Sequence, residues 1–345
     1  MKKLKIAIIG CGSITEKRHA PEYVDNPHVE LVGFYDLNKV RSELMVEKFG
    51  GKVFNTYQEI LDNPEIDAIS DCTPNFMHIE ICINALKKGK HVLCEKPMAI
   101  SLDEATQIMR WEKESQKVFF IDHNQRFNQA HIEVKNIIKS GNYGKILSFR
   151  TVFGHGGPEN WSESKSKNTW FFKKSQSKYG VIGDLGVHKL DLIRYLTGLE
   201  FVEVSAMGGI LHKTFENGDP IEVYDNTVVL MKLSNSALGT GAFSWTYYGK
   251  EDNSTVIYLE NAEIRIYDDE KYQIKIIEKS GHKIDYQVEK MQTNDSQTKT
   301  GVIDSFIDCI MTNRQSPVNA YDGYKSIEII NAIVKAILEK RTITL

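Results

Sequence analysis

The chain has 345 residues, of which 41% are hydrophobic and 26% are charged, and its formal net charge is −3. This length suggests two domains, and the composition is that of a globular protein with enough apolar residues for a sizeable core. The nearly balanced charge gives no electrostatic argument for binding nucleic acid or an anionic membrane surface, so we expect neither partner.

No apolar stretch approaches the roughly 18 residues that a membrane span requires. Residues 1–3 run directly into an expected strand without a signal-peptide pattern, so we expect a cytoplasmic protein. The cysteines are odd in number, lack C-x-x-C spacing and lie mostly in apolar segments, which indicates buried reduced thiols and no metal site. They are Cys11, Cys72, Cys82, Cys94 and Cys309.

An apolar run of strand length, residues 4–9, breaks at two glycines before a helix expected over residues 16–24. Gly10 would form the tight turn, and Gly12, which has no Cβ, would let the backbone approach a pyrophosphate at the helix N-terminus. The pattern departs from G-x-G-x-x-G/A at Thr15, which must pack against the strand and should hold the helix slightly farther off. The candidate pyrophosphate-binding residues are Gly10, Gly12, Ser13 and Ile14.

The next expected strand, residues 30–35, ends in Asp36. It follows the turn by about 20 residues, where a carboxylate can bond both ribose hydroxyls of NAD and repel the 2′-phosphate of NADP. Lys39 and Arg41 lie close enough to leave NADP open as a second cofactor. The alternative is an ordinary strand–helix turn and a strand-end Asp that caps the next helix.

The first third of the chain continues to alternate helices and strands, which predicts a six-stranded, doubly wound parallel sheet of the Rossmann type in a domain over residues 1–122. The segment from Thr56 is expected to begin with a Thr N-cap, and that from Ser101 with a Ser101-x-x-Glu104 capping box. We expect helices at residues 38–49, 56–61, 76–88 and 101–115, and strands at 67–72, 91–94 and 118–121.

Polar residues follow three of these strands, where an open parallel sheet binds its ligands. Lys96 is the strongest candidate for a catalytic residue among them. A lysine between a buried strand and a proline is held rigidly and can direct its ammonium at a hydroxyl or carbonyl oxygen. Pro97 raises the chance of a cis bond to about 5%. A solvent-facing lysine is the alternative. The polar clusters are Thr73-Pro74-Asn75, Glu95-Lys96-Pro97 and Asp122-His123-Asn124-Gln125-Arg126.

Beyond residue 122 the pattern changes to long alternating strands, which predicts an α+β domain over residues 123–345 with a large, mostly antiparallel, open-faced sheet. Strands are expected at residues 146–153, 202–210, 222–233, 238–248, 255–259, 263–267 and 273–278, helices at 130–139, 183–196, 301–312 and 324–340, and a polar stretch at 292–298. Phe243, Trp245 and Tyr247 alternate along one strand, and we expect them on the open face as an oligomer interface. The alternative is a sheet covered by its own loops.

Asp184 and His188 are four residues apart in an expected helix, so their side chains should share a face. A histidine can take a hydroxyl proton near neutral pH, and the carboxylate can orient its ring or hold a neighbouring substrate hydroxyl. A packed or capping pair is the alternative. We interpret Asp191 as structural, bonded to nearby backbone.

The irregular segment 154–179 is longer than compact domains normally carry without a function, and we expect a lid or pocket wall. The candidate substrate contacts are Asn124, Arg126, His155 and Trp170, with Lys173 or Lys174 for an acid or phosphate group. Each of the loop residues could instead face water.

These motifs together resemble the Gfo/Idh/MocA oxidoreductase family over nearly the whole chain. The resemblance rests on Gly10-x-Gly12, Asp36, Thr73-Pro74-Asn75-x-x-His78, Glu95-Lys96-Pro97 and Asp184-x-Gly186-x-His188-x-x-Asp191-Leu192. It implies an NAD(P)-dependent dehydrogenase, a C-terminal sheet used for homodimer or homotetramer contacts, and a catalytic set of Lys96, Asp184 and His188. It also implies cofactor contacts from Thr73, Pro74, Asn75, His78, Glu95 and Lys96.

The expected reaction is oxidation of a secondary alcohol on a sugar or cyclitol. His188 would accept the hydroxyl proton, Lys96 would bond the reacting oxygen, and Asp184 would hold the adjacent hydroxyl. Two other classes stay open: a glycoside hydrolase that recycles NAD, and a non-catalytic NAD(H)-binding regulator. Net NADH formation would distinguish the dehydrogenase from both.

Overall fold

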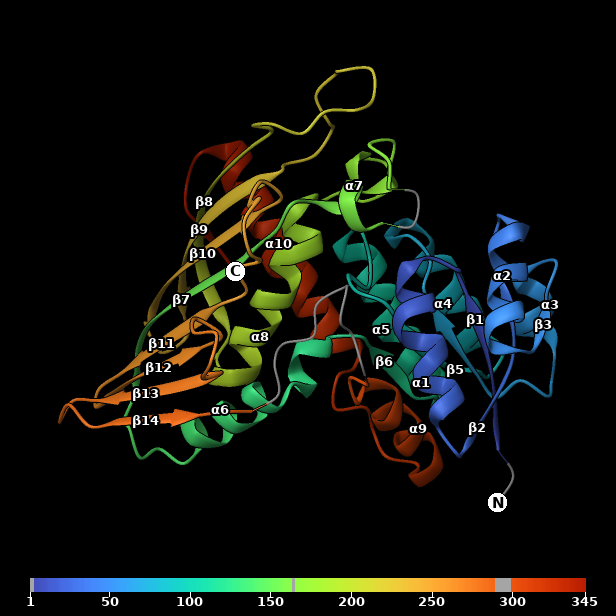
Figure 1. Ribbon diagram of the computed structural model, residues 1–345, viewed down its shortest axis with the longest axis horizontal. Helices are drawn as coiled ribbons and strands as arrows, with labels where there is room; N and C mark the ends of the chain where they lie inside the picture. The colour runs from blue at the N-terminus through green and yellow to red at the C-terminus, as the bar shows by residue number, and fades with distance from the viewer. Residues whose placement is uncertain (1–2, 163–164, 289–298) are drawn as a thin grey trace. The chain divides into compact units, whose positions relative to one another are not determined.

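The computed structural model describes residues 3–162, 165–288 and 299–345 (Figure 1). These residues form two compact units. The first contains residues 3–124, 161–162 and 299–327, and the second contains residues 125–160, 165–288 and 328–345. The domain boundary expected at residue 122 stays a prediction; as a compact unit, the first part of the chain also includes residues 299–327. The polar stretch expected at 292–298 lies outside the described residues.

The first unit contains the predicted parallel sheet, whose described strands follow the order β3-β2-β1-β4-β5-β6. The strands are β1 (Leu4–Ile9), β2 (Val29–Tyr35), β3 (Lys52–Val53), β4 (Ala68–Asp71), β5 (His91–Cys94) and β6 (Phe119–Ile121). The six-stranded Rossmann sheet is therefore confirmed. Strand β3 was not among the expected ranges, because two residues are too few to show an alternation of apolar and polar side chains. It is defined only by its pairing with Gly33 and Phe34 of β2.

Helices cover both faces of this sheet, because right-handed crossovers run in opposite directions on the two sides of β1. The expected caps are present: Thr56 accepts a hydrogen bond from the Glu59 N–H, and Ser101 accepts one from the Glu104 N–H. Glu104 itself accepts from the Ile100 N–H, one residue before the cap. The helical segments of this unit are η1 (Thr15–His19), α1 (Ala20–Asp25), α2 (Lys39–Phe49), α3 (Tyr57–Asp62), η2 (Asn75–Met77), α4 (His78–Lys87), α5 (Leu102–Ser115) and α9 (Val302–Thr312), with the first residues of α10 (Ala320–Glu339).

The strand register brings the carboxyl ends of the strands to one edge of the sheet. Ile9 of β1 pairs with Asp71 of β4, Asp71 with Cys94 of β5, and Cys94 with Ile121 of β6. The residue that follows each strand therefore emerges at the same level. These residues are Gly10, Cys72, Glu95 and Asp122.

The second unit contains the predicted α+β architecture, with described strands in the order β14-β13-β12-β11-β7-β10-β9-β8-β15. Neighbouring strands are antiparallel except β10 and β7, which are parallel. The strands are β7 (Ile146–Gly154), β8 (Phe201–Gly209), β9 (Asn226–Leu233), β10 (Leu238–Ser244), β11 (Thr255–Leu259), β12 (Ala262–Ile266), β13 (Ile274–Glu278), β14 (Lys283–Tyr286) and β15 (Ile343–Thr344). The short strands β14 and β15 were not predicted.

One face of this second sheet packs against helices of the same unit, as Figure 1 shows for α6 and α8. The helical segments here are α6 (Gln129–Lys139), α7 (Pro158–Trp161), η4 (Trp170–Phe172), η5 (Ile182–Gly186), α8 (Val187–Thr197) and the remainder of α10. Among the described helices, none combines the length and the apolar character that a bilayer crossing requires.

The prediction that Phe243 and Trp245 lie on the open face is wrong. Both are buried, and Phe243 packs beside Gly186 on the helix-covered face. A period of two assigns alternate residues to opposite faces but does not say which face the helices cover. Tyr247 is half-buried and follows the end of β10.

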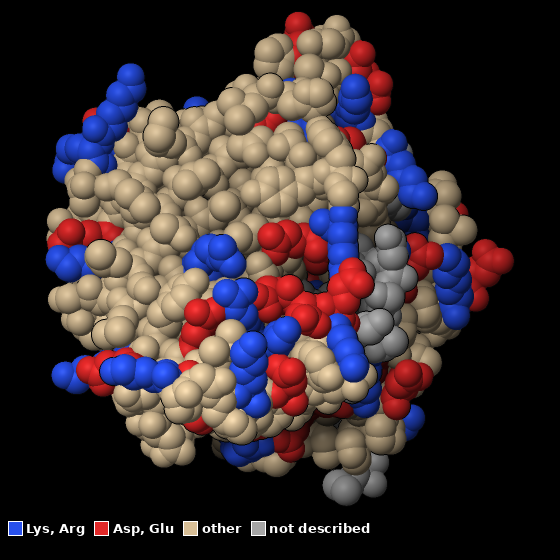
Figure 2. All heavy atoms as spheres, turned by 60° about the vertical axis from the view of Figure 1, so that its left-hand side comes forward, with Lys and Arg blue, Asp and Glu red and all other residues tan. Residues whose placement is uncertain are grey.

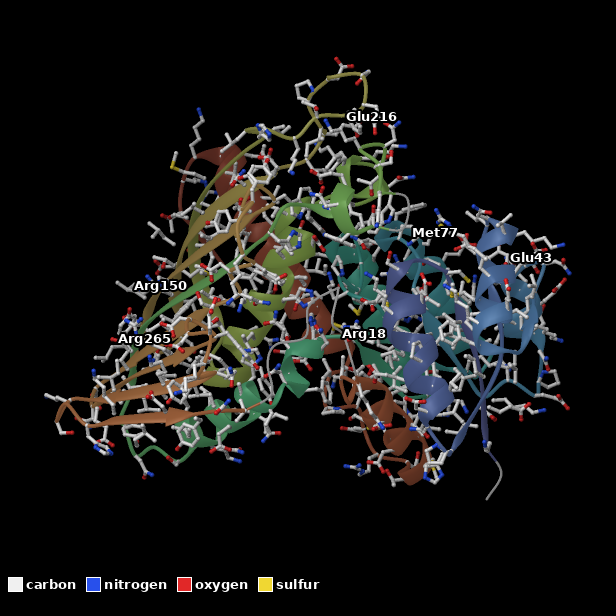
Figure 3. The ribbon with its side chains drawn as sticks, in the orientation of Figure 1. Arg18, Glu43, Met77, Arg150, Glu216 and Arg265 are labelled. Carbon is white, nitrogen blue, oxygen red and sulfur yellow. The ribbon has the colours of Figure 1, made fainter. Side chains whose placement is uncertain are left out.

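The open face instead carries the residues of opposite parity. Leu230 pairs with Thr240 and Ser205, and Thr240 pairs with Arg150, which is labelled in Figure 3. Four apolar side chains on this face are strongly exposed: Met207 (81%), Val228 (57%), Leu230 (59%) and Leu238 (62%). Figure 2 shows a broad area of uncharged side chains on the side of the molecule where this sheet lies.

Candidate active site

The first strand–helix turn has the geometry that its glycines predict. Gly10 has φ +94°, and a Cβ there would lie 2.6 Å from the carbonyl carbon and oxygen of Cys72, so only glycine fits. A Cβ on Gly12 would meet no described atom within 4 Å, so this position is open on the side where a pyrophosphate would approach. The turn therefore fits a dinucleotide, with N–H groups at the start of the following helix available to its charge.

Thr15, the departure from the glycine pattern, is accommodated by a hydrogen bond. Its buried hydroxyl donates to the carbonyl oxygen of Gly10 over 2.6 Å. The helix starts with the wide π-turn η1 at this same residue. Thr15 is thus bonded to the glycine turn that it follows.

Asp36 connects the glycine turn to the next helix. Its Oδ2 accepts from the Cys11 N–H and its Oδ1 from the Asn38 N–H, both over 2.8 Å. The N-cap of α2 is Asn38, which accepts from the Val40 N–H, so Asp36 is not the cap itself. Each carboxylate oxygen retains a second acceptor site. Asp36 is therefore held at the end of β2 with capacity left for a ribose hydroxyl.

The loop after β4 is organised by Asp71 and His78. Asp71 Oδ1 accepts from the backbone N–H and the hydroxyl of Thr73, at 3.2 and 2.6 Å. His78 is fully buried, with Nδ1 at 3.0 Å from the Pro97 carbonyl oxygen and Nε2 at 2.9 Å from that of Thr73. Asn75, at the start of η2, is 6% exposed.

The loop after β5 begins with Glu95, whose carboxylate points into a buried polar network. It accepts from Arg18 at 3.0 Å and lies 2.9 Å from His19 Nε2. Arg18, labelled in Figure 3, also pairs with Asp122 at 2.7 Å. Burial alone would raise the pKa of Glu95, but His19 and Arg18 outweigh it and hold that pKa well below its usual range. The buried ion pairs of Glu95 thus anchor the first residue of this loop.

Lys96 follows Glu95 and precedes Pro97, and the Lys96–Pro97 peptide bond is cis. The Lys96 N–H lies 3.2 Å from Glu95 Oε2, and the Lys96 side chain is half-buried. Sequence reasoning missed Arg18 and His19, which fix this loop. Their neighbours Glu16, Lys17 and Glu22 are also charged, so no local pattern distinguishes a buried Arg18 or His19 from a solvent-facing one.

Two buried groups of side chains could offer ligand atoms to a metal ion, but both are already engaged in hydrogen bonds. Their ligand atoms lie within 4.8 Å of one another in each group. In the first, both nitrogens of His78 face carbonyl oxygens. In the second, an ion would compete with the guanidinium of Arg18 for both carboxylates. The groups are Asp71, His78 and Cys94, and His19, Glu95 and Asp122.

In the second unit, Asp184 is 7% exposed and accepts a hydrogen bond from Trp245 Nε1 over 3.0 Å. It lies in the π-turn η5, whereas His188 lies in the first turn of α8. A π-turn is wider than an α-turn, so the α-helical spacing assumed from the sequence does not apply across η5. The His188 ring is half-buried, with its centroid 5.8 Å from that of Phe153. Their joint action stays a prediction.

Asp191 binds a side chain that is distant in sequence; the structural role and the bond to nearby backbone expected for it stay predictions. Its two carboxylate oxygens accept from Nε and Nη2 of Arg126, at 2.7 and 2.6 Å. Both side chains are buried, and the Arg126 guanidinium also lies 5.5 Å from the centroid of the Tyr195 ring. Arg126, predicted as a substrate contact, is thus bound to Asp191. The pair is separated by 65 residues in sequence, which no local pattern could reveal.

The predicted loop 154–179 contains more structure than expected, because α7 and η4 lie within it. His155 Nδ1 accepts from the Gly157 N–H at 3.0 Å, and Trp170 stacks on Phe171 with ring centroids 3.9 Å apart. Lys213, which the sequence did not single out, donates to the Gly156 carbonyl oxygen at 2.6 Å and pairs with Glu159.

The remaining predicted substrate contact, Asn124, belongs to the first unit just beyond β6. Among the described residues, no hydrogen-bond donor serves its buried Oδ1. Lys173 is half-buried and Lys174 is exposed. Their part in substrate binding stays a prediction.

Comparison with known proteins identifies the family. Residues 4–123 match the family described as "Oxidoreductase family, NAD-binding Rossmann fold", and residues 131–265 match the GFO/IDH/MocA C-terminal domain. The chain belongs to the Gfo/Idh/MocA oxidoreductase family. The resemblance noted from its motifs is confirmed, and its first sheet is the NAD-binding Rossmann fold of this family.

Several relatives in the Gfo/Idh/MocA family are named dehydrogenases. Glucose-6-phosphate 3-dehydrogenase of Bacillus subtilis is 38% identical over 206 residues, which are 58% of this chain and only 56% of that protein. Levoglucosan dehydrogenase of Pseudarthrobacter phenanthrenivorans is 29% identical, over 74% of this chain and 71% of the relative. The NAD(+)-named scyllo-inositol 2-dehydrogenase of Bacillus subtilis is 26% identical, over 95% and 92%.

Solved structures support the same fold over the whole chain. Aldose-aldose oxidoreductase from Caulobacter crescentus superposes with a TM-score of 0.85 at 24% identity, covering 100% of both chains. Levoglucosan dehydrogenase in complex with NADH and levoglucosan gives a TM-score of 0.86 at 23% identity, covering 100% of this chain and 99% of that one. At these identities the likeness establishes the fold alone.

Proposed function

We propose that this protein is an NAD-dependent dehydrogenase that oxidises a secondary hydroxyl of a sugar or cyclitol. The observation that carries the proposal is the position of Lys96. It follows a buried, ion-paired Glu95 at the same sheet edge as the Gly10 turn, so an ammonium is fixed at the edge where a Rossmann fold binds its cofactor. A regulator would need only the turn and Asp36.

The residues that would hold NAD fit the group. Gly12, Ser13 and Ile14 would contact the pyrophosphate, and Asp36 would bond the adenosine ribose with its remaining acceptor sites. When bound, the nicotinamide supplies the hydride acceptor. Thr73, Pro74 and Asn75 would border it from the neighbouring strand end, because β4 lies beside β1.

The catalytic roles follow from the chemistry of the three predicted side chains. Lys96 would donate to the reacting oxygen and stabilise developing alkoxide charge. His188 would accept the hydroxyl proton, since an imidazole is suited to proton transfer near neutral pH. Asp184, oriented by Trp245, would hold the adjacent hydroxyl of a polyol.

The substrate class is supported by the names of the relatives, which refer to a hexose phosphate, levoglucosan and scyllo-inositol. Asn124 and His155 are candidate hydroxyl contacts, and Trp170 is a candidate for stacking on a sugar ring. One face of Trp170 already stacks on Phe171, which would leave the opposite face for a ligand. Lys173 or Lys174 would serve a substrate that carries an acid or phosphate group.

NAD is the proposed cofactor because a carboxylate at the ribose position repels a 2′-phosphate. Two Bacillus subtilis relatives are named as NAD(+) and NADP(+) scyllo-inositol 2-dehydrogenases, so cofactor choice varies among relatives and must be decided by each chain's own residues. Lys39 and Arg41 are the residues of this chain that could reduce the preference for NAD over NADP.

A second copy of the chain is the proposed protein partner. It would cover the open face of the second sheet, where Met207, Val228, Leu230 and Leu238 are exposed. An exposed apolar surface of this kind is typical of an interaction site.

The decisive experiment records absorbance of the reduced nicotinamide while the protein is offered inositols, hexoses, hexose phosphates, levoglucosan and glycosides with NAD or NADP. We expect NADH to form with one sugar or cyclitol, and replacing Lys96 by Ala should lower turnover by about 10²–10³ while NAD still binds. Cleavage of a glycoside without net NADH would instead establish a recycling hydrolase, and NAD binding without any turnover would favour a regulator.

A further inference from the structure

His78 makes two hydrogen bonds that a neutral histidine cannot make. Its Nδ1 lies 3.0 Å from the Pro97 carbonyl oxygen and its Nε2 lies 2.9 Å from the Thr73 carbonyl oxygen. A carbonyl oxygen only accepts, so each ring nitrogen must carry a hydrogen. A neutral imidazole would direct a lone pair at one of the two carbonyls. The geometry therefore requires an imidazolium in a position with no solvent exposure.

The buried carboxylate of Asp71, one of three groups that face His78, supplies the compensating negative charge. Asp71 at the end of β4 and Cys94 at the end of β5 lie beside the ring, and Cys82 of α4 donates to Asp71 Oδ2 over 3.5 Å. All three side chains are fully buried. Burial opposes the charge on His78, but Cys94 and Asp71 outweigh it and raise the pKa of His78 well above its ordinary value.

The two carbonyls belong to the loops that surround Lys96. Thr73 follows β4 and Pro97 follows β5, and these strands are neighbours whose last residues, Asp71 and Cys94, pair with each other. Lys96 lies between Glu95, which Arg18 and His19 hold, and Pro97, which His78 holds. The backbone is therefore anchored on both sides of the lysine.

We propose that His78, as a buried imidazolium, is a positioning residue that joins the Thr73–Asn75 loop to the Glu95–Pro97 loop and thereby fixes Lys96. This inference rests on the proposed function of Lys96. It also replaces the expected role of His78 as a cofactor contact, since both of its nitrogens are occupied by carbonyl oxygens within the fold.

The charge is tested first, by nitrogen NMR of the protein labelled with [15N]histidine, which needs no substrate. We expect both ring nitrogens of His78 to be protonated at pH 7.5, with the signals assigned by their loss in His78→Gln. His91 provides a neutral reference in the same sheet: its Nδ1 accepts from the Val118 N–H, and burial lowers its pKa to about 4. One protonated nitrogen on His78 at this pH would overturn the proposal.

The positioning role is tested by kinetics of His78→Gln, whose amide keeps one donor but turns an oxygen toward the second carbonyl. We expect kcat to fall by about 10²-fold, the cost of misplacing a catalytic group by about 1 Å, while the Kd for NAD changes by less than about threefold. His91→Gln is the matched control and should retain kcat within about twofold. An increased Kd for NAD with unchanged kcat would place His78 in the cofactor site and overturn the proposal.

A pH series separates positioning by a charge from packing alone. The folded pKa of His78 is raised, so its stabilising contribution is complete below the unfolded pKa of about 6.5 and is lost as pH rises through the folded value. The loss of stability in His78→Gln should therefore be largest at pH 6 and shrink at alkaline pH. A stability loss in His78→Gln that does not depend on pH would contradict the imidazolium.

Failure of the proposed function and failure of this inference can be told apart. If the wild-type protein oxidises no substrate, the proposed function of Lys96 is wrong, whereas the NMR result still decides the charge of His78.

Discussion

The indole Nε1 of Trp245 donates to Oδ2 of Asp184 over 3.0 Å, and both side chains are buried. This bond joins the end of the β10 segment to the π-turn before α8, 61 residues away in sequence. This buried hydrogen bond fixes the orientation of the Asp184 carboxylate, which would hold a substrate hydroxyl in the proposed reaction.

Replacing Trp245 by Phe should lower both stability and activity. The ring is largely retained, but a buried carboxylate loses its donor, which costs about 1–3 kcal/mol of unfolding free energy. We expect kcat/KM to fall by about 10-fold in the same variant, a loss of about 1.4 kcal/mol. Urea unfolding and steady-state kinetics measure the two effects. Trp111→Phe on α5 is the control, because Lys87 lies over that ring and, within the described part of the chain, no carboxylate accepts a hydrogen bond from its indole. Equal losses in both variants would remove the special role of Trp245.

Breaking the Arg126–Asp191 pair should destabilise the second unit. Replacing Asp191 by Leu leaves a buried guanidinium without its carboxylate, and the expected loss is about 3–5 kcal/mol of unfolding free energy. The double variant Arg126→Met, Asp191→Leu should recover most of this loss, because two apolar side chains replace the charged pair. Urea denaturation of the single and double variants tests the coupling. Additive losses would mean that the two side chains do not interact.

Replacing Asp36 by Ala should weaken NAD binding and reduce discrimination against NADP. Hydrogen bonds to a charged group contribute about 1.5–3 kcal/mol, so we expect the Kd for NAD to rise by about 10–100-fold. Titrations with both cofactors measure the change. Glu43→Ala on the exposed face of α2 is the control, since Glu43 is exposed and its carboxylate lies 3.8 Å from the ammonium of Lys39. An unchanged ratio of NADP to NAD affinity would argue against Asp36 as the specificity residue.

Lys189 should make stability depend on alkaline pH. It is fully buried, donating to the Asn253 carbonyl oxygen at 2.7 Å, and burial lowers its pKa to about 7. Between pH 7 and about 10.5 the unfolded chain binds a proton at this lysine that the folded chain does not, so stability should rise with pH across this window.

The contribution of Lys189 can be isolated by comparing Lys189→Met with the wild-type protein at pH 7 and pH 10. In Lys189→Met, the unfolding free energy should no longer show the rise with pH that Lys189 causes. Lys232→Met is the control: Lys232 forms a half-exposed ion pair with Glu203, and this variant should show the same rise as the wild type. Guanidinium unfolding at both pH values provides the measurement. The same slope in Lys189→Met and the wild type would show that Lys189 does not titrate in this window.

The open sheet face should control association between copies of the chain. Replacing Leu230 by Glu and Leu238 by Lys places charges on neighbouring strands of that face, where they would have to be desolvated in an interface. We expect light scattering to show a dimer or tetramer for the wild type and a monomer for the double variant. Met311→Lys, at an exposed position on α9, is the control. If light scattering shows a monomer for the wild-type protein, the proposal that a second copy of the chain covers this face is wrong.

Much of the first unit could be predicted from the sequence, because its turns and helix caps depend on residues that are close together along the chain. Gly10 must adopt a positive φ, Thr56 and Ser101 are side chains that bond their own helix N-termini, and alternation of strands with helices requires parallel strands. These features depend on residues within one or two turns of the chain. The strands β3, β14 and β15 were missed because segments this short are defined by the strand they pair with rather than by their own periodicity.

The sequence by itself determined the Rossmann turn, the helix caps and the positions where polar residues follow strands. Only the tertiary structure decided that Trp245 faces the helices, that Asp191 binds Arg126, and that His78 lies between the carbonyls of Thr73 and Pro97. The physical reason is that backbone preferences act between near neighbours. The partner of a buried charge and the covered face of a sheet depend on segments brought together only when the chain packs.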